Sequence, residues 1–405
     1  MPILLHESTA YAPRLTRAPM ITTLLAAVLA TGAVAAQPRA EFVPVTDAML
    51  QNPDPADWLM WRRTLDSWGH SPLNEIDRDN VADLKMVWTR ALGPGLQEGT
   101  PLVYDGVMYF PNPSDLIQAF DAASGDLLWE YRRALPADLG EYFPVPSINR
   151  NLAIWGDSII DTSSDDYLFA LDARTGELKW ETKLFDYRRG AQQTSGPIIA
   201  NGKIVSGRGC EPEGSPAACV IMAHDARSGS ELWRRRTIAA PDEVNGDSWG
   251  NLADEERWHV GSWLVPSYDP ELDLVFAGTS VTSPAPKFAL AGNERQYLYH
   301  NSTLALAAET GEIAWYYQHI VDHWDLDHPF ERLLVETAVA PDRDAVTWIN
   351  PRVRPGERRK VVTGIPGKTG IVYTLDRATG EFLWARPTVQ QNVLESIDGL
   401  TGEAT

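Results

Sequence analysis

The chain has 405 residues, enough for two or three small domains or for one large repetitive one. Its formal net charge of −20 argues against a nucleic-acid partner, because binding to a phosphate backbone needs a positive patch. The same charge permits a basic partner, such as a basic electron-transfer protein.

The N-terminus has the pattern of an export signal. Arg14 and Arg17 precede an apolar run, 21–34, that ends in small residues. This run is too short and too rich in alanine to be a good membrane span. We therefore expect residues 1–36 to be a signal peptide, with Met20 as an alternative start, and the mature protein to be periplasmic without a membrane span. A buried helix at the domain edge is the alternative interpretation.

A repeat runs through most of the remaining chain. Five segments share a strand, a four-residue turn that contains Gly, and a second strand that carries Trp: Ala119–Trp129, Ala170–Trp180, Ala223–Trp233, Ala305–Trp315 and Thr374–Trp384. Each is typical of a β-hairpin, because Gly supplies the positive φ that the turn needs. Four short strands with their turns take about 50 residues, the size of one propeller blade. The sequence therefore predicts an all-β propeller, with these tryptophans packed between blades.

The spacing of the repeat tryptophans also indicates where binding loops lie. Successive tryptophans are 51, 53, 82 and 69 residues apart, so the last two intervals contain insertions. Insertions on a regular scaffold commonly carry binding residues.

Two cysteines, Cys210 and Cys219, fall in the second of these intervals, between Trp180 and Trp233. Export would place them in an oxidising compartment, where they can pair across a short loop. Their spacing matches no zinc or haem signature. A local disulfide and two buried free thiols both remain open.

The Gly-x-x-x-Trp ending of the repeats resembles the tryptophan-docking motif of the pyrroloquinoline-quinone (PQQ) dependent alcohol dehydrogenases. The resemblance extends from about Asp57 to Trp384, with departures at Arg62 and His70. It implies a propeller that has eight blades in the family. Five repeats do not close such a ring, so we expect residues 37–405 to supply the N-terminal five to six blades of a truncated gene product or fragment that lacks the C-terminal blades.

The resemblance also implies a set of cofactor-binding residues. Trp263 matches the tryptophan that forms the floor beneath the PQQ ring, and Arg150 matches the arginine that binds a PQQ carboxylate. A guanidinium suits that role because it presents a planar fork of donors. Glu98 and Thr194 match two further polar contacts, and Lys368 matches the cation that contacts the quinone oxygens. A plain turn or surface role is the alternative for each polar residue.

Three carboxylates are candidate ligands for a metal ion. Glu211 matches the family's carboxylate ligand, and Asp325 and Asp327 lie in the run 322–328, which is dense in acids and histidines. If this run is a strand, residues 325 and 327 point to the same face. Ligation by oxygens alone suits calcium, whereas the Asp-x-Asp pair is associated with lanthanide-using members of the family. A solvated acidic turn is the alternative.

Two positions depart from the family pattern. Val281 stands where an asparagine ligand is expected, so Ser280, Thr282 or water would have to complete the coordination. The pair Pro144-Val145 stands where many family members carry adjacent cysteines that cover the opposite face of the ring.

The implied activity is oxidation of a small alcohol by PQQ with bound calcium or a lanthanide. Asp325 would take the hydroxyl proton, Lys368 would donate to the quinone oxygen, and electrons would pass to an external acceptor such as a cytochrome. The main alternative is a non-catalytic PQQ-like propeller that acts as a binding or scaffold protein. A calcium-dependent propeller hydrolase or lyase acting on a sugar is a further one. No Gly-x-Gly-x-x-Gly segment opens a helix after a strand, which argues against a nicotinamide enzyme.

Overall fold

The structure is a computed structural model that describes residues 41–142, 148–257, 259–282, 295–321 and 324–405. The expected signal peptide and the pair Pro144-Val145 lie outside these residues. A compact unit extends from Phe42 to Thr405. In the described part of the chain, no helix combines the length and the apolar character that crossing a bilayer requires.

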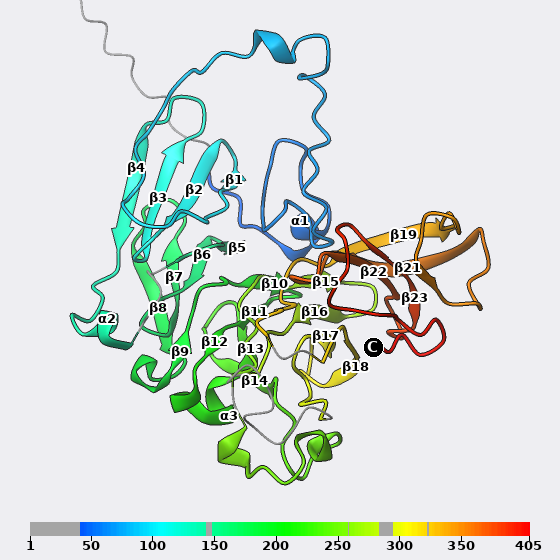
Figure 1. Ribbon diagram of the computed structural model, residues 1–405. Coiled ribbons are helices and arrows are strands. Elements are labelled where there is room, and N and C mark those ends of the chain that lie inside the picture. The colour runs from blue at the N-terminus through cyan, green and yellow to red at the C-terminus, as the bar shows by residue number, and fades with distance from the viewer. Residues whose placement is uncertain (1–40, 143–147, 258, 283–294, 322–323) are drawn as a thin grey trace, which may run out of the picture. The chain divides into compact units, whose positions relative to one another are not determined.

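Five antiparallel sheets of four or more strands follow one another through the described residues, from cyan to red in Figure 1. The first contains β1–β4 (Leu102–Tyr104, Val107–Asn112, Leu116–Asp121, Leu127–Arg132), and the second contains β5–β8 (Ala153–Trp155, Ser158–Thr162, Tyr167–Asp172, Leu178–Lys183). The third contains β10, β11, β13 and β14 (Ile198–Ala200, Lys203–Gly207, Val220–Asp225, Glu231–Arg236), and the fourth contains β15–β18 (Ser267–Asp269, Leu274–Gly278, Ser302–Ala307, Ile313–Gln318). The fifth has the order β19-β21-β22-β23-β20 (Leu333–Val339, Glu357–Gly364, Ile371–Asp376, Phe382–Pro387, Trp348–Ile349).

The remaining elements are short. A two-stranded sheet pairs β9 (Ala191–Gln192) with β12 (Gly209–Cys210). The α-helices are α1 (Asp47–Gln51), α2 (Leu139–Tyr142) and α3 (Ser215–Ala218), and single 3₁₀ turns occur at Val81–Asp83, Tyr187–Arg189, Pro212–Gly214, Gly246–Trp249 and Asp254–Glu256. The predicted all-β architecture is confirmed.

Each predicted hairpin forms the last two antiparallel strands of one sheet. In the first, the Asp121 carboxylate accepts hydrogen bonds from the backbone N–H groups of Ala123 (3.1 Å) and Ser124 (3.0 Å), and Gly125 N–H donates to the Asp121 carbonyl. This Asx-type turn reverses the chain within four residues. The register shifts by one residue between Ala119 and Phe120, and the other four hairpins shift at the equivalent place.

The chain contains a sixth turn of the same kind near its C-terminus. Asp398 accepts from the N–H groups of Leu400 and Thr401, as an aspartate does in four of the five hairpins. Gly402 N–H donates to the Asp398 carbonyl, as the turn glycine does in all five. A single bridge, Ile397 to Ala404, follows it. No Trp closes this segment, so the sequence pattern of the five repeats does not include it.

The repeat tryptophans join neighbouring sheets, as predicted. The Trp129 indole N–H of the first sheet donates to the Ala173 carbonyl of the second (3.0 Å), and its ring lies over Gly176. The same stacking pairs Trp180 with Gly229, Trp233 with Gly311, and Trp315 with Gly380. Each glycine therefore serves both its turn and a tryptophan from the preceding sheet.

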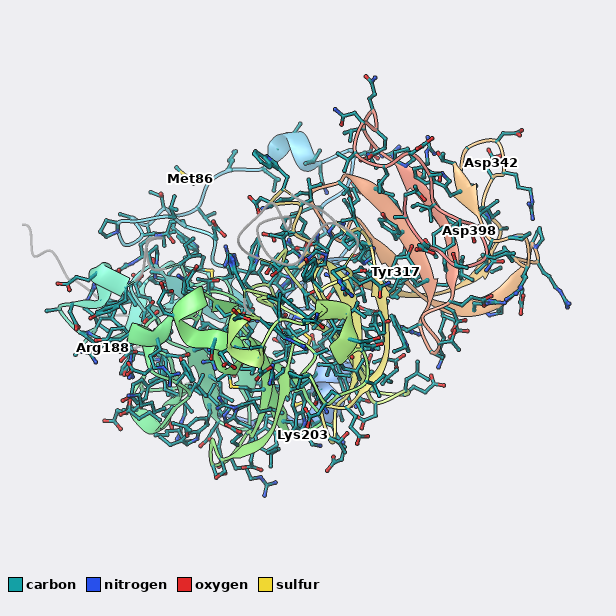
Figure 2. All side chains as sticks on the ribbon, turned by 60° about the horizontal axis from the view of Figure 1, so that its bottom comes forward. Met86, Arg188, Lys203, Tyr317, Asp342 and Asp398 are labelled. Carbon is teal, nitrogen blue, oxygen red and sulfur yellow. A yellow bond between two sulfur atoms is a disulfide. The ribbon has the colours of Figure 1, made fainter. Side chains whose placement is uncertain are left out.

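Two tryptophans depart from this pattern. Trp384 pairs with Ile349 of β20, which covers the outer edge of the fifth sheet. Trp88, outside the five repeats, stacks on Gly125 and donates to the Ala122 carbonyl (3.1 Å) like the repeat tryptophans. It belongs to none of the described strands, and Met86, two residues before it and labelled in Figure 2, is 81 % exposed.

The stacking predicts a difference between two turn glycines that share the same backbone conformation. Gly176 and Gly106 have φ of +74° and +70°, but a Cβ on Gly176 would lie 2.5 Å from Trp129 Cε3, whereas one on Gly106 meets no atom within 4 Å. Gly106→Ala is expected to lower the free energy of unfolding by about 1 kcal/mol through strain alone. Gly176→Ala adds overpacking and is expected to lower it by about 3 kcal/mol or more. Denaturant unfolding of both variants measures the difference, and equal losses would contradict the structural importance of the stack.

Candidate active site

A cavity of about 330 Å³ opens where several inter-strand connections meet. Its walls are formed by Ile148, Arg150, Gln192, Thr194, Gly209, Cys210, Glu211, His259, Gly261, Trp263, Ser280, Val281, Asp325, Asp327 and Lys368. Seven of the eight predicted site residues are among them, and the eighth, Glu98, hydrogen-bonds to one of them. The volume lies within the range of small-molecule and cofactor sites.

The long connections predicted from the tryptophan spacing supply several of these residues. Residues 237–266 link the third sheet to the fourth and carry Trp263, and residues 319–332 link the fourth to the fifth and carry both aspartates. Residues about 220 positions apart in sequence therefore share one cavity.

Arg150 and Trp263 form one side of the cavity. The guanidinium carbon lies 5.1 Å from the Trp263 ring centroid, and Nε donates to Glu98 Oε2 (2.7 Å). Nη1 donates to the backbone carbonyl of Thr194 (3.0 Å), so the contact made by Thr194 uses its main chain. Burial lowers the pKa of Arg150, and the Glu98 carboxylate opposes this by raising it. The buried guanidinium therefore has a carboxylate partner. The ring of Phe330 meets Trp263 edge-on at 5.9 Å and fixes the indole plane.

Lys368 joins the two predicted aspartates. Its Nζ donates to Asp325 Oδ1 (2.7 Å) and to Asp327 Oδ2 (3.1 Å). Burial alone would lower the pKa of Lys368, but the two carboxylates outweigh it and raise the pKa above its usual value. The Asp325 side chain is 71 % exposed and that of Asp327 only 10 %, so Asp325 is the carboxylate that an incoming molecule can reach.

The segment that carries the two aspartates is not a strand. It is irregular, and Asp322 and His323 of the predicted run lie outside the described residues. The alternation of a strand therefore does not bring Asp325 and Asp327 together. Instead Arg332, which is 3 % exposed, donates to the carbonyls of His328 (2.6 Å) and Phe330 and holds the segment in a bend.

At position 281, where the family pattern has an asparagine, the backbone contacts a site residue in place of the side chain. Val281 offers no side-chain ligand, but its N–H donates to Asp327 Oδ1 (2.7 Å). Of the two alternatives to the expected asparagine, Ser280 lines the cavity and accepts from Gly261 N–H (2.8 Å), whereas Thr282 is fully buried and does not line it.

Glu211 also lines the cavity and is fixed through its neighbours. Cys210 and Cys219 form a disulfide with a Cα–Cα distance of 5.2 Å, which settles the alternative left open by the sequence. Glu211 N–H donates to the Gly190 carbonyl (2.7 Å), and Gln192 Nε2 donates to Glu211 Oε1 (3.3 Å). The short sheet of β9 and β12 and the disulfide therefore hold this carboxylate at the cavity wall.

The donors fit an anionic planar ligand together with a hard cation. One face offers an indole ring, two side chains are cationic, and three carboxylates supply oxygen ligands of the kind that calcium and lanthanide ions prefer. Within the described ranges, no three His, Cys, Asp or Glu side chains already stand close enough together to form a metal site. Glu211 and the two aspartates line the same cavity, but the ammonium of Lys368 engages the aspartates.

Two polar residues that line the cavity were not predicted from the sequence: Gln192 and His259. Gln192 lies two residues before Thr194, so the motif that marked Thr194 could also have marked Gln192. His259 carries no sequence signal, because the feature that marks it is its backbone conformation, with φ of +62°.

A comparison with known families agrees with this geometry. The model of the PQQ glucose/ethanol/alcohol dehydrogenase β-propeller domain matches residues 58–397. The chain belongs to this family. Its resemblance to the PQQ dehydrogenases, stated above from the repeats, is thereby confirmed, and so is the propeller fold.

Individual family members are similar over most of this chain. The dehydrogenase subunit of a quinone alcohol dehydrogenase from Komagataeibacter europaeus is 31 % identical over 371 residues, 86 % of this chain and 48 % of the relative. A quinohemoprotein alcohol dehydrogenase from Pseudomonas putida is 31 % identical over 366 residues, 86 % of this chain and 48 % of the relative. The chain spans about half the length of the curated relatives it matches.

Solved structures agree in fold. The crystallised quinohemoprotein alcohol dehydrogenase of Pseudomonas putida HK5 superimposes with a TM-score of 0.79 at 30 % identity, over 90 % of this chain and 53 % of the other. A europium-containing methanol dehydrogenase superimposes with a TM-score of 0.75 at 25 % identity, over 88 % of this chain and 62 % of the other.

Proposed function

We propose that this protein oxidises an alcohol with PQQ and a bound calcium or lanthanide ion in the periplasm, and passes the electrons to an external acceptor such as a cytochrome. The observation that carries the proposal is the convergence of Arg150, Trp263 and Lys368 with three carboxylates on one cavity. A propeller that serves only as a scaffold has no physical need for such a set. Membership of a family of PQQ dehydrogenases supports the same function.

Different side chains of the cavity would bind the cofactor and the cation. The Trp263 ring offers a flat apolar surface for the cofactor, and the Arg150 guanidinium offers paired donors to a carboxylate. Glu211, Asp325 and Asp327 would hold the cation, with Ser280 as the nearby hydroxyl. When bound, PQQ supplies the carbon that accepts a hydride, and the cation polarises the quinone.

Asp325 is the proposed general base. It is the exposed carboxylate of the pair, and a substrate hydroxyl can approach its free oxygen while the other oxygen stays bonded to Lys368. Asp325 takes the hydroxyl proton as the alcohol is oxidised. Asp327 is buried and bonded to both Val281 N–H and Lys368, so it holds the lysine in place.

The choice between calcium and a lanthanide rests on charge. The Asp325-x-Asp327 pair gives the cavity a third carboxylate, and an extra negative ligand favours a trivalent ion. The europium in the methanol dehydrogenase that this fold resembles supports a lanthanide as one of the two candidates. The net charge of −20 suits a basic electron carrier.

The proposal predicts saturable, metal-dependent binding of PQQ. We expect PQQ to quench tryptophan fluorescence in the presence of calcium or lanthanum, with a marked loss of affinity when the metal is chelated. Trp263→Ala should remove most of the quenching, whereas Trp155→Phe, a change at the end of β5 that does not line the cavity, should leave the affinity unchanged.

A folded protein that binds no PQQ with either ion would contradict the proposal. That outcome would favour the non-catalytic propeller, with Val281 as the position where ligation was lost. Binding with calcium alone, or with lanthanum alone, would assign the metal.

A further inference from the structure

Lys368 reaches the two aspartates from a segment whose backbone is bonded to theirs. The Lys368 N–H donates to the Asp327 carbonyl (3.0 Å). Residues 365–370 lie between β21 and β22, and residues 319–332 lie between β18 and β19. A turn within the fifth sheet and the connection that leads into this sheet therefore meet where the ammonium contacts Asp325.

The imidazole of His328 lies against both neighbours of Lys368. A Cβ on Gly367 would overlap with Cγ and Cδ2 of the ring, so only glycine leaves room for the ring there. On the residue after the lysine, Thr369 Oγ1 lies 3.3 Å from His328 Nε2, within hydrogen-bonding distance. His328 is 0 % exposed and Thr369 is 4 % exposed. One buried side chain therefore contacts the residue before Lys368 and the residue after it.

The position of the His328 ring is fixed by its own contacts. It stacks on the imidazole of His319, with the centroids 4.9 Å apart and the planes 5° from parallel. His319 Nε2 lies 2.8 Å from Thr303 Oγ1, and the Tyr373 ring meets the His319 ring edge-on at 4.5 Å. Thr303 belongs to β17 and Tyr373 to β22, so the fourth and the fifth sheets together hold the stacked rings.

The ammonium of Lys368 depends on the backbone that carries it. Its side chain is long, flexible and 34 % exposed, so packing alone does not fix it. A leucine in place of His328 would still fill space against Gly367, but it would leave the buried Thr369 hydroxyl without this partner. Because a buried hydroxyl without a hydrogen bond costs free energy, the segment 367–369 would then shift to pair it elsewhere.

We propose that His328 is a positioning residue that keeps the Lys368 ammonium between Asp325 and Asp327. His328 is not among the residues that line the cavity, so it acts only through the segment 367–369. The consequence for the cofactor rests on the function proposed above, whereas the positioning of Lys368 is measured without cofactor.

The reactivity of the Lys368 amine reports its position. Burial lowers the pKa of Lys368, and the two carboxylates outweigh burial and raise it. An ammonium that leaves the carboxylates loses its proton more readily, so its amine reacts faster. We expect acetic anhydride to acetylate Lys368 about 2- to 10-fold faster in His328→Leu than in the wild-type protein, the factor that corresponds to one lost hydrogen bond. Mass spectrometry of the cofactor-free protein measures the rate.

Two further variants separate the hydrogen bond from packing. His328→Gln places an amide at about the reach of Nε2, so it should keep the slow acetylation of Lys368. Thr369→Val removes the hydroxyl at nearly constant volume and should match His328→Leu. The valine variant also provides the test if His328→Leu does not fold.

His224→Leu is the matched control. His224 in β13 is also 0 % exposed, and neither of its ring nitrogens has a hydrogen-bond partner in the described part of the chain. The control should leave both the acetylation of Lys368 and the affinity for PQQ unchanged. His328→Leu is expected to bind PQQ about 2- to 10-fold more weakly, in a titration with calcium or lanthanum present.

The outcomes distinguish this inference from the proposed function. Equal acetylation of Lys368 in the wild-type protein and in His328→Leu or Thr369→Val would overturn the inference, and binding of PQQ by the wild-type protein would still support the proposed function. Acetylation that is equally fast in His328→Gln and His328→Leu would also overturn it, because the hydrogen bond would then be irrelevant. Faster acetylation in His328→Leu and Thr369→Val alone, in a protein that binds no PQQ, would support the positioning and contradict the proposed function.

Discussion

Replacement of Asp325 by asparagine is expected to lower kcat for alcohol oxidation by about 100- to 10,000-fold, the usual contribution of a general base. The side chain keeps its size and its hydrogen bond to Lys368 can be kept through the amide oxygen, so only the capacity to take a proton is lost. Because the side chain is 71 % exposed, we expect the free energy of unfolding to change by less than about 0.5 kcal/mol.

The measurement is steady-state oxidation with a dye acceptor, with PQQ and metal at saturating concentrations. Asp342→Asn is the matched control: Asp342 is an exposed aspartate after β19, labelled in Figure 2, and it should keep full activity. If Asp325→Asn regained full kcat at high metal concentration, Asp325 would act only as a metal ligand and the proposed role as the base would be wrong.

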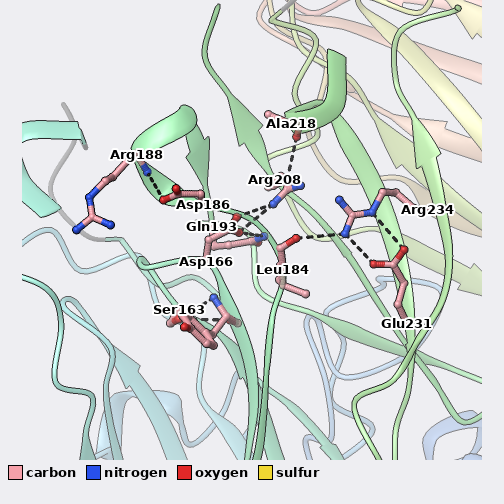
Figure 3. A network of polar contacts seen from close by, with 11 residues as sticks. Ser163, Asp166, Leu184, Asp186, Arg188, Gln193, Arg208, Ala218, Glu231 and Arg234 are labelled. Carbon is pink, nitrogen blue, oxygen red and sulfur yellow. Dashed lines mark hydrogen bonds and ion pairs between the residues drawn. The ribbon is translucent and has the colours of Figure 1, made fainter. Parts of the chain in front are cut away.

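Replacement of Asp166 by asparagine is expected to lower the free energy of unfolding by about 3–5 kcal/mol. Asp166 and Arg208 form an ion pair in which both side chains are fully buried, with Arg208 Nη1 2.7 Å and 3.0 Å from the two carboxylate oxygens. Arg208 Nε also donates to the Ala218 carbonyl, and Gln193 donates to Asp166 (Figure 3). Removal of the carboxylate charge would leave a guanidinium buried without a counter-ion.

The Asp166–Arg208 ion pair lies where its loss would also affect the candidate active site. Asp166 lies in the turn between β6 and β7, and Arg208 lies between Gly207 of β11 and Gly209 of β12. The pair therefore fastens the second sheet to the strand that leads to Cys210 and Glu211. Burial lowers the pKa of Arg208, with Asp166 opposing this effect, so loss of Asp166 would lower that pKa further.

Two further variants test the explanation. Glu231→Gln removes the partner of Arg234 in a nearby ion pair that is partly exposed, also drawn in Figure 3, and should cost only about 0.5 kcal/mol. The double variant Asp166→Asn/Arg208→Met removes both buried charges and should recover most of the loss. Urea unfolding measures all three, and equal losses for the buried and the exposed pair would contradict the argument.

The sequence by itself determined the repeating unit, and its resemblance to a known family named seven of the residues that line the cavity. Gly and Trp recur at fixed offsets in all five repeats and Asp in four of them, because Asp supplies a side-chain acceptor for the turn, Gly its positive φ, and the stack needs a flat ring over a residue without Cβ. These local requirements can therefore be recognised from the sequence alone. The resemblance to the PQQ dehydrogenases then marked Arg150, Trp263 and Lys368, and the structure brings all three to one cavity. Their roles stay predictions.

Only the tertiary structure decided how distant segments act on one another. The sequence left open whether the two aspartates lie in a strand or a turn, and the buried Arg332 bends that segment by binding its carbonyls, a contact that no spacing in the sequence reveals. The stack of Trp88 on Gly125 joins a segment with no repeat of its own to the first sheet. Local patterns encode local turns, whereas burial, pairing and strain arise only when the sheets pack together.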